Sequence, residues 1–147
     1  MQPSSGKPSG LIKPTLDTKY HIDYGWWERN PEEELRLYIL SHLTPEQREQ
    51  LASATETQLI DYIDPETGRV TKLDEVGLAI QVAAQDPNFI NTQTPLVDTL
   101  FRVFLANHNQ PLSSRELEER TGRPAMTILK MLSGGRVWKG IRPYLTE

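Results

Sequence analysis

The chain contains no cysteine. This absence excludes a disulfide framework, a catalytic thiol and a zinc site built from thiolates. The sequence also has no run of about 18 apolar residues, so we expect no transmembrane helix. The first ten residues lack the apolar stretch of a secretory signal, and without an export signal we expect a cytoplasmic protein with no membrane partner.

Motifs that bind nucleotides or metals are missing as well. The chain has no glycine-rich phosphate loop, and Gly134-Gly135 is typical of a helix stop. The three histidines, His21, His42 and His108, are too far apart in the sequence to match the spacing of metal ligands. We therefore expect no cofactor, no metal site and no enzymatic activity.

The charge is distributed unevenly along the chain. Charged residues make up 24% of the 147 residues and the net charge is −4. Residues 91–147 hold eight basic and five acidic side chains, a net charge of +3, so the first ninety residues carry −7. Between Gly122 and Thr146 there is no acid but there are five cations: Arg123, Lys130, Arg136, Lys139 and Arg142. Such a stretch is a candidate surface for phosphate groups or for an acidic partner. The alternative is that these cations merely suit the end of a helix.

The first part of the chain predicts a tail followed by a small α+β portion, residues 19–90. Residues 1–18 are rich in Pro, Ser, Gly and Lys and have no hydrophobic periodicity, so we expect a flexible tail, which docking could order from Leu11 onward. Further on, LIDYI and RVTKL alternate apolar and polar residues around the turn sequence DPETG. This pattern predicts a β-hairpin within residues 59–73.

Three helices are expected around that hairpin. Helix start signals occur at Asn30, Thr44 and Asp74, each followed by residues that suit a first turn. The aromatic stretch before the first of these signals includes Trp26 and Trp27. Paired tryptophans beside a helix start bury a large area, so we expect them to anchor the core.

Residues 94–147 predict a second portion built from three helices and a short strand. Apolar periodicity and start signals place the helices at about residues 95–107, 113–121 and 124–133. The final stretch RVWKGIRPYL has the β-branched and aromatic character of a strand, which could pair near Leu112. The expected fold class is therefore α+β and mostly helical.

The segment PLSSRELEERTGRPAMTILKML has two helices joined by a turn that contains Gly122. On these residues the chain resembles the bacterial winged helix-turn-helix superfamily, over residues 94–142 at most. The resemblance implies that Leu117, Ile128 and Met131 lock the two helices together. No family is recognised for the N-terminal half.

The resemblance also implies a function. Helix 124–133 would lie in a DNA major groove, and most contacts would be made to backbone phosphates. The expected protein is therefore a DNA-binding or transcription-associated factor. Its implied contact residues are Ser113, Ser114, Arg123, Thr127, Lys130, Arg136, Lys139 and Arg142.

An alternative follows from residues that depart from the family pattern. Glu118 stands where the family prefers a small apolar residue, and Arg123 replaces an apolar turn residue. Met126, Leu129 and Trp138 would suit a protein partner better than a groove of DNA if they are exposed. The alternative function is therefore a non-enzymatic adaptor that uses a helix-turn-helix scaffold to bind a protein.

Overall fold

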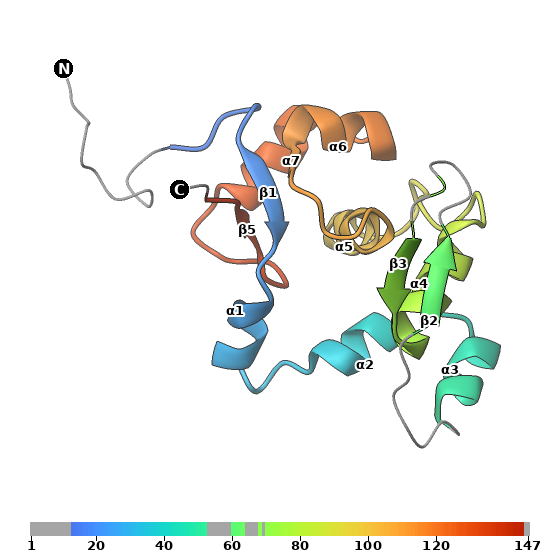
Figure 1. Ribbon diagram of the computed structural model, residues 1–147. Coiled ribbons are helices and arrows are strands. Elements are labelled where there is room, and N and C mark those ends of the chain that lie inside the picture. Colours follow the sequence, from blue (N-terminus) through green and yellow to red (C-terminus); the bar gives the residue numbers. More distant parts are fainter. Residues whose placement is uncertain (1–12, 53–59, 64–67, 69, 146–147) are drawn as a thin grey trace. The chain divides into compact units, whose positions relative to one another are not determined.

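The computed structural model describes residues 13–52, 60–63, 68 and 70–145 (Figure 1). This part contains seven helices and five short strands, which confirms the expected α+β, mostly helical fold class. In chain order they are β1 (Lys19–Ile22), α1 (Tyr24–Arg29), α2 (Leu35–Leu40), α3 (Pro45–Ala52), β2 (Ile60–Ile63), β3 (Val70–Leu73), α4 (Glu75–Ala84), α5 (Leu96–Ala106), β4 (Leu112–Ser113), α6 (Ser114–Thr121), α7 (Ala125–Leu132) and β5 (Ile141–Pro143).

The chain forms two compact units. Their residue ranges differ from the expected division of the chain at residues 90–94. Unit 1 combines Met1–Asn30 with Ile90–Glu147, and unit 2 is Pro31–Phe89. Residues 19–30 therefore belong with the C-terminal part, because β1 pairs with strands that lie about ninety residues or more further along the chain. Of the expected tail, residues 1–12 lie outside the described part of the chain, and residues 13–18 lie within it. The backbone N–H of Arg115 donates to the carbonyl of Leu16, which fixes residues just before β1.

A three-stranded antiparallel sheet organises unit 1, with the order β4-β1-β5. Tyr20 pairs with Leu112 on one side and with Pro143 on the other. The side chain of Asn109 extends the pairing, because its amide both accepts from the N–H and donates to the carbonyl of Ile22 at 2.8 and 2.9 Å. The C-terminal strand is thus present, but β1 lies between it and Leu112 instead of the direct pairing that we expected.

The core of unit 1 lies between this sheet and the helices α5, α6 and α7. Tyr20 and Ile22 alternate with more exposed residues along β1 and are almost fully buried. The helix α5 contacts β1, and its residues Phe101 and Phe104 are also fully buried. Trp27 meets Phe101 edge to face at 6.1 Å, so its expected role as a core anchor is confirmed, whereas Trp26 is half-buried.

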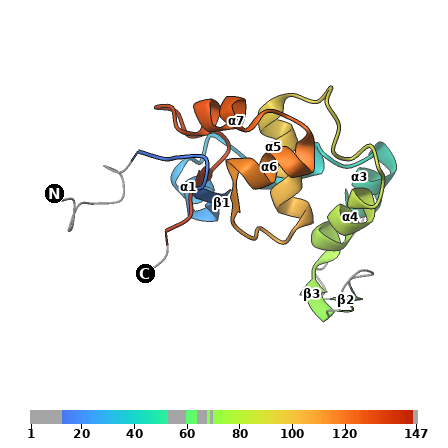
Figure 2. The ribbon, with the colours of Figure 1, turned by 90° about the horizontal axis from the view of Figure 1, so that it is seen from above.

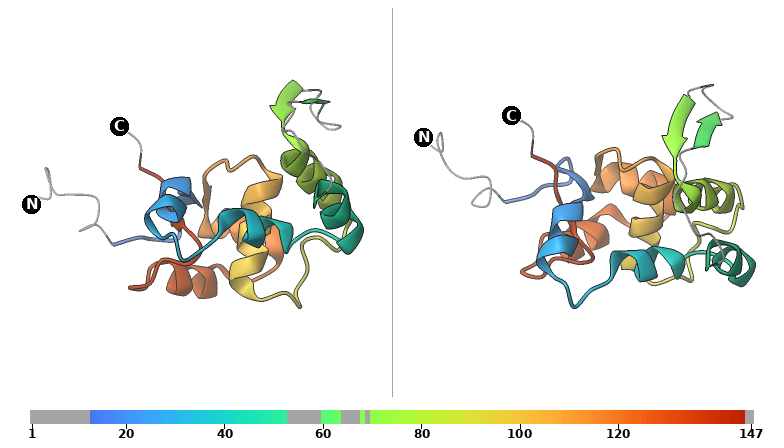
Figure 3. Two further views of the ribbon diagram at one scale, coloured as in Figure 1. Left: turned by 90° about the horizontal axis from the view of Figure 1, so that it is seen from below. Right: turned by 60° about the horizontal axis from the view of Figure 1, so that its bottom comes forward.

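Unit 2 contains the expected hairpin, in which β2 pairs with β3 and leads into α4 (Figure 3). The start signals at Thr44 and Asp74 are confirmed, since their side chains accept hydrogen bonds from Gln47 N and Gly77 N. The prediction that a helix begins at Asn30 is wrong. Asn30 instead ends α1, where its side chain donates to the carbonyl of Trp26, and the next helix begins at Leu35.

A tight turn at residues 138–141 fixes the last strand against the start of α1. Lys139 and Gly140 both have left-handed backbone conformations, with φ of 52° and 78°. The carbonyl of Gly140 accepts a hydrogen bond from the N–H of Asp23 at 2.8 Å. A Cβ at Gly140 would lie 2.9 Å from Trp27 Nε1, so the close approach requires glycine.

We expect Gly140→Ala to lower the free energy of unfolding by about 1–3 kcal/mol, because it adds both backbone strain and a clash with Trp27. Chemical denaturation would measure the change. The matched control is Gly135→Ala, where an added Cβ meets nothing within 4 Å and the change should stay within about 0.5 kcal/mol. Equal effects of the two substitutions would contradict the role of the turn.

The side chain of Asp23 joins α1 to β5. Its carboxylate accepts a hydrogen bond from the N–H of Gly25 and so caps α1. It also forms ion pairs with the guanidinium groups of Arg29 and Arg142, each at an N–O distance of 3.2 Å. Burial opposes ionisation of this group, but the hydrogen bonds from Arg29 and Gly25 and the nearby cations outweigh it, and the pKa of Asp23 lies below its ordinary value of 3.8. The ionised carboxylate is therefore the form that stabilises the fold.

We expect Asp23→Ala to lower the free energy of unfolding by about 1–2 kcal/mol at neutral pH, through the lost cap and ion pairs. A carboxylate whose folded pKa is depressed stabilises the fold above its unfolded pKa and loses that effect as the pH falls through the folded pKa. The difference between wild type and variant should therefore shrink as the pH drops below about 3.8. The control is Asp17→Ala, which breaks only an exposed pair with Arg115 and should have little effect.

Candidate nucleic-acid interface

The expected pair of helices is present as α6 and α7, joined at Gly122 (Figure 2). Gly122 has φ of 74°, and its N–H donates to the carbonyl of Glu118, which ends α6. Leu117 and Ile128 are fully buried, as expected for residues that hold the two helices together. Met131 is half-exposed, and Leu132 occupies the buried position at the end of α7 instead.

Ser113 and Ser114 do not face solvent, which corrects their expected role in phosphate contacts. Ser113 and Glu116 form a reciprocal capping box, and the Ser113 side chain is buried within it. The Ser114 side chain is fully buried. Glu116 in turn pairs with Lys19 of β1, and the hydrogen bonds from Lys19 and from the Ser113 N–H hold the pKa of Glu116 below its ordinary value. The first turn of α6 is therefore linked to β1 by the ion pair between Glu116 and Lys19.

Arg123 and Arg142 of the acid-free stretch form polar contacts with residues of unit 1 that lie outside this stretch. The guanidinium of Arg123 donates to the carbonyl of Thr94 at 3.1 Å, which ties the turn between α6 and α7 to the segment before α5. Arg142 pairs with Asp23. Both arginines were expected at the DNA, and the structure gives each of them an internal contact instead.

The other three cations lie on or just after α7. Lys130 and Arg136 are exposed, and the guanidinium of Arg136 stacks 4.1 Å from the ring centre of Trp138. Lys139 is half-buried, with its ammonium 5.9 Å from the ring of Trp27. Stacking occupies the face of a guanidinium and leaves the N–H donors at its edge available. Lys130 and Arg136 thus remain suitable for binding phosphate.

The three apolar residues of the adaptor hypothesis differ in exposure. The side chain of Met126 is 59% exposed, whereas Leu129 and Trp138 are half-buried. Thr127 is exposed beside Met126, so the outward face of α7 carries one apolar residue, one hydroxyl and the ammonium of Lys130. Neither a continuous apolar patch nor a row of base-reading side chains results.

Glu118 has a role that the sequence did not reveal. Its carboxylate accepts a hydrogen bond from the N–H of Ala125 at 2.9 Å and so caps α7, which begins after Pro124 and has no cap from its own N-cap side chain. A negative charge near a helix N-terminus also interacts favourably with the helix dipole. The glutamate at position 118, where the resemblance predicts a small apolar residue, thus stabilises the first turn of α7. It also places a negative charge at the N-terminus of the helix that would enter a DNA groove.

The outward face of the sheet carries His21 of β1. Its ring meets that of Tyr144 edge to face at 5.1 Å. Burial lowers the pKa of His21, and Arg142 adds to this effect, while Asp23 opposes it.

In the described ranges no three His, Asp or Glu residues are grouped to hold a metal ion. No helix in the described part of the chain has the length and apolar character needed to cross a membrane.

We expect Glu118→Ala to lower the free energy of unfolding by about 1 kcal/mol, because the start of α7 loses its cap. Glu119→Ala is the matched control on the exposed face of α6 and should change stability by less than about 0.5 kcal/mol. Urea denaturation of both variants makes the comparison. If the two substitutions have the same effect, the contact with Ala125 does not stabilise α7.

Comparison of the chain with family models, with curated proteins and with solved structures found no match.

Proposed function

We propose that this protein binds nucleic acid, mainly through backbone phosphates, with Lys130, Arg136 and Lys139 as the principal contacts. The observation that carries the proposal is the pair of exposed cations, Lys130 and Arg136, in a stretch without acidic residues. Within the described residues neither of them forms an ion pair with an acidic side chain. Their charge is thus available to an external anion.

The contact set is smaller than the sequence suggested, since Ser113 and Ser114 are buried and Arg123 and Arg142 make internal contacts. Thr127 can add a hydroxyl beside Lys130. The outward side chains of α7 include none of the arginine, asparagine or glutamine residues that usually read base edges. These features favour contacts with phosphates over recognition of a base sequence.

Salt dependence provides the test. Each neutralised phosphate contributes a slope of about −0.9 to the plot of log affinity against log salt concentration, so three contacts predict a slope of about −3. We expect Lys130→Ala/Arg136→Ala to reduce that slope by about two units. Fluorescence anisotropy with a labelled duplex, at salt concentrations of about 50–200 mM, would measure it.

The control is Lys13→Ala/Arg36→Ala, which removes two exposed cations from outside the acid-free stretch and should leave the slope unchanged. Equal losses in the two double variants would mean that binding depends only on net charge. That result would contradict a localised interface.

The adaptor remains the second candidate, and the exposure of Met126 favours it. Met126 and Lys130 are four residues apart on α7, so they lie on the same helix face. An apolar and a cationic side chain together suit an acidic protein surface that also has an apolar spot. Absence of duplex binding at about 50 mM salt would favour this candidate over nucleic acid.

A further inference from the structure

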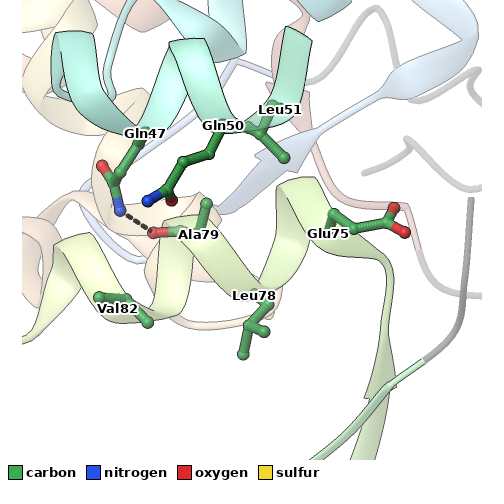
Figure 4. Close-up of a pocket in the computed structure, with 7 residues that line it drawn as sticks. All are labelled: Gln47, Gln50, Leu51, Glu75, Leu78, Ala79 and Val82. Carbon is green, nitrogen blue, oxygen red and sulfur yellow. Dashed lines mark hydrogen bonds between the residues drawn. The ribbon is translucent and has the colours of Figure 1, made fainter. Parts of the chain in front are cut away.

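A groove runs between α3 and α4 within unit 2 (Figure 4). Its volume is about 390 Å³. Each helix contributes residues spaced three and four apart, which form a single stripe along its surface. The lining residues are Gln47, Gln50, Leu51, Glu75, Leu78, Ala79 and Val82.

Apolar residues form most of the α4 side of the groove, and one polar contact links the two helices. The side-chain amide of Gln47 donates to the carbonyl of Ala79 at 3.1 Å, which links the two helices at one point (Figure 4). Val82 lines the groove and is nevertheless 51% exposed. Leu78 is half-buried beside it. The groove therefore includes apolar surface that the fold of unit 2 leaves partly uncovered.

Unit 2, which contains the groove, is strongly acidic. Unit 2 holds twelve acidic and four basic side chains, a net charge of −8 in 59 residues. Glu75 lines one end of the groove. Glu46 is exposed four residues before Gln50, so it lies along the same strip of α3. A ligand that offers apolar surface together with positive charge would therefore complement this groove.

We infer that the groove binds a basic amphipathic helix of a partner protein. Its apolar stripe would pack against Leu78 and Val82, and its lysine or arginine side chains would reach the acidic residues on either side. Helices commonly bind in apolar grooves through residues spaced i, i+3, i+4 and i+7. The lining residues of α4 run from Glu75 to Val82, about 10 Å along the helix axis, so the groove accommodates about two turns of such a helix.

The test uses the full chain and three labelled synthetic peptides of equal length. The first has leucine on one helical face and lysine on the other. The second has glutamic acid in place of lysine, and the third has glutamine in place of leucine. Fluorescence anisotropy should show binding of the leucine–lysine peptide and at least about tenfold weaker binding of the other two, because each lacks one of the two required features.

Two variants locate the binding site. Val82→Lys places a cation inside the groove and should weaken binding of the leucine–lysine peptide at least about tenfold. Leu37→Lys makes the same change of charge at a residue of α2 that is 60% exposed and does not line the groove, and it should change binding less than about twofold. Circular dichroism would check that both variants stay folded.

Other outcomes would overturn the inference. Equal binding of the glutamine peptide would mean general attraction to an acidic protein, and equal binding of the glutamic acid peptide would remove the need for a basic partner. Equal effects of Val82→Lys and Leu37→Lys would place the peptide elsewhere. A dimer in sedimentation velocity that Val82→Lys dissociates would assign the groove to a second copy of this chain.

Discussion

Pairing of β1 on both of its edges is the constraint on which unit 1 depends. A strand in the middle of a sheet needs partners for the hydrogen-bonding groups on both sides, since unpaired buried N–H and C=O groups are costly. β4 supplies one side, β5 the other, and the Asn109 amide completes the row at Ile22. Tyr20 and Ile22 can fill the core only while this pairing holds.

The contacts around β1 also decide which charged side chains are left for a partner. Lys19 forms an ion pair with Glu116, and Arg142 forms one with Asp23. Two cations of the sheet are therefore paired with carboxylates of the same unit. Arg123 is used in a similar way at the turn between α6 and α7. What remains for an external anion is concentrated on α7 and the loop that follows it. The candidate interface is thus defined by the contacts that stabilise the fold.

The two units differ in charge as well as in structure. Unit 2 carries −8, so the remaining residues, with twelve basic and eight acidic side chains, carry +4. A net charge of −4 for the chain therefore conceals two units of opposite net charge. The interface proposed for nucleic acid lies in the basic unit, and the groove for which we infer a basic helix lies in the acidic unit.

The sequence by itself determined the local features of this protein. The caps at Thr44, Asp74 and Ser113, the hairpin and the break at Gly122 depend on residues within a few positions of one another, and all of them were predicted. The fold class follows from these elements. Asn30 shows the limit of such signals, because a capping residue can end one helix as well as begin another.

The tertiary structure decided the sheet and the availability of the site residues. β1 is only four residues long and gives a weak pattern, and its partners lie about ninety residues or more away. The pairing of Arg142 with Asp23 joins residues 119 positions apart, and the burial of Ser114 depends on the packing around the start of α6. Such contacts exist only after the chain has closed on itself, so no local pattern of residue types could reveal which cations remain exposed.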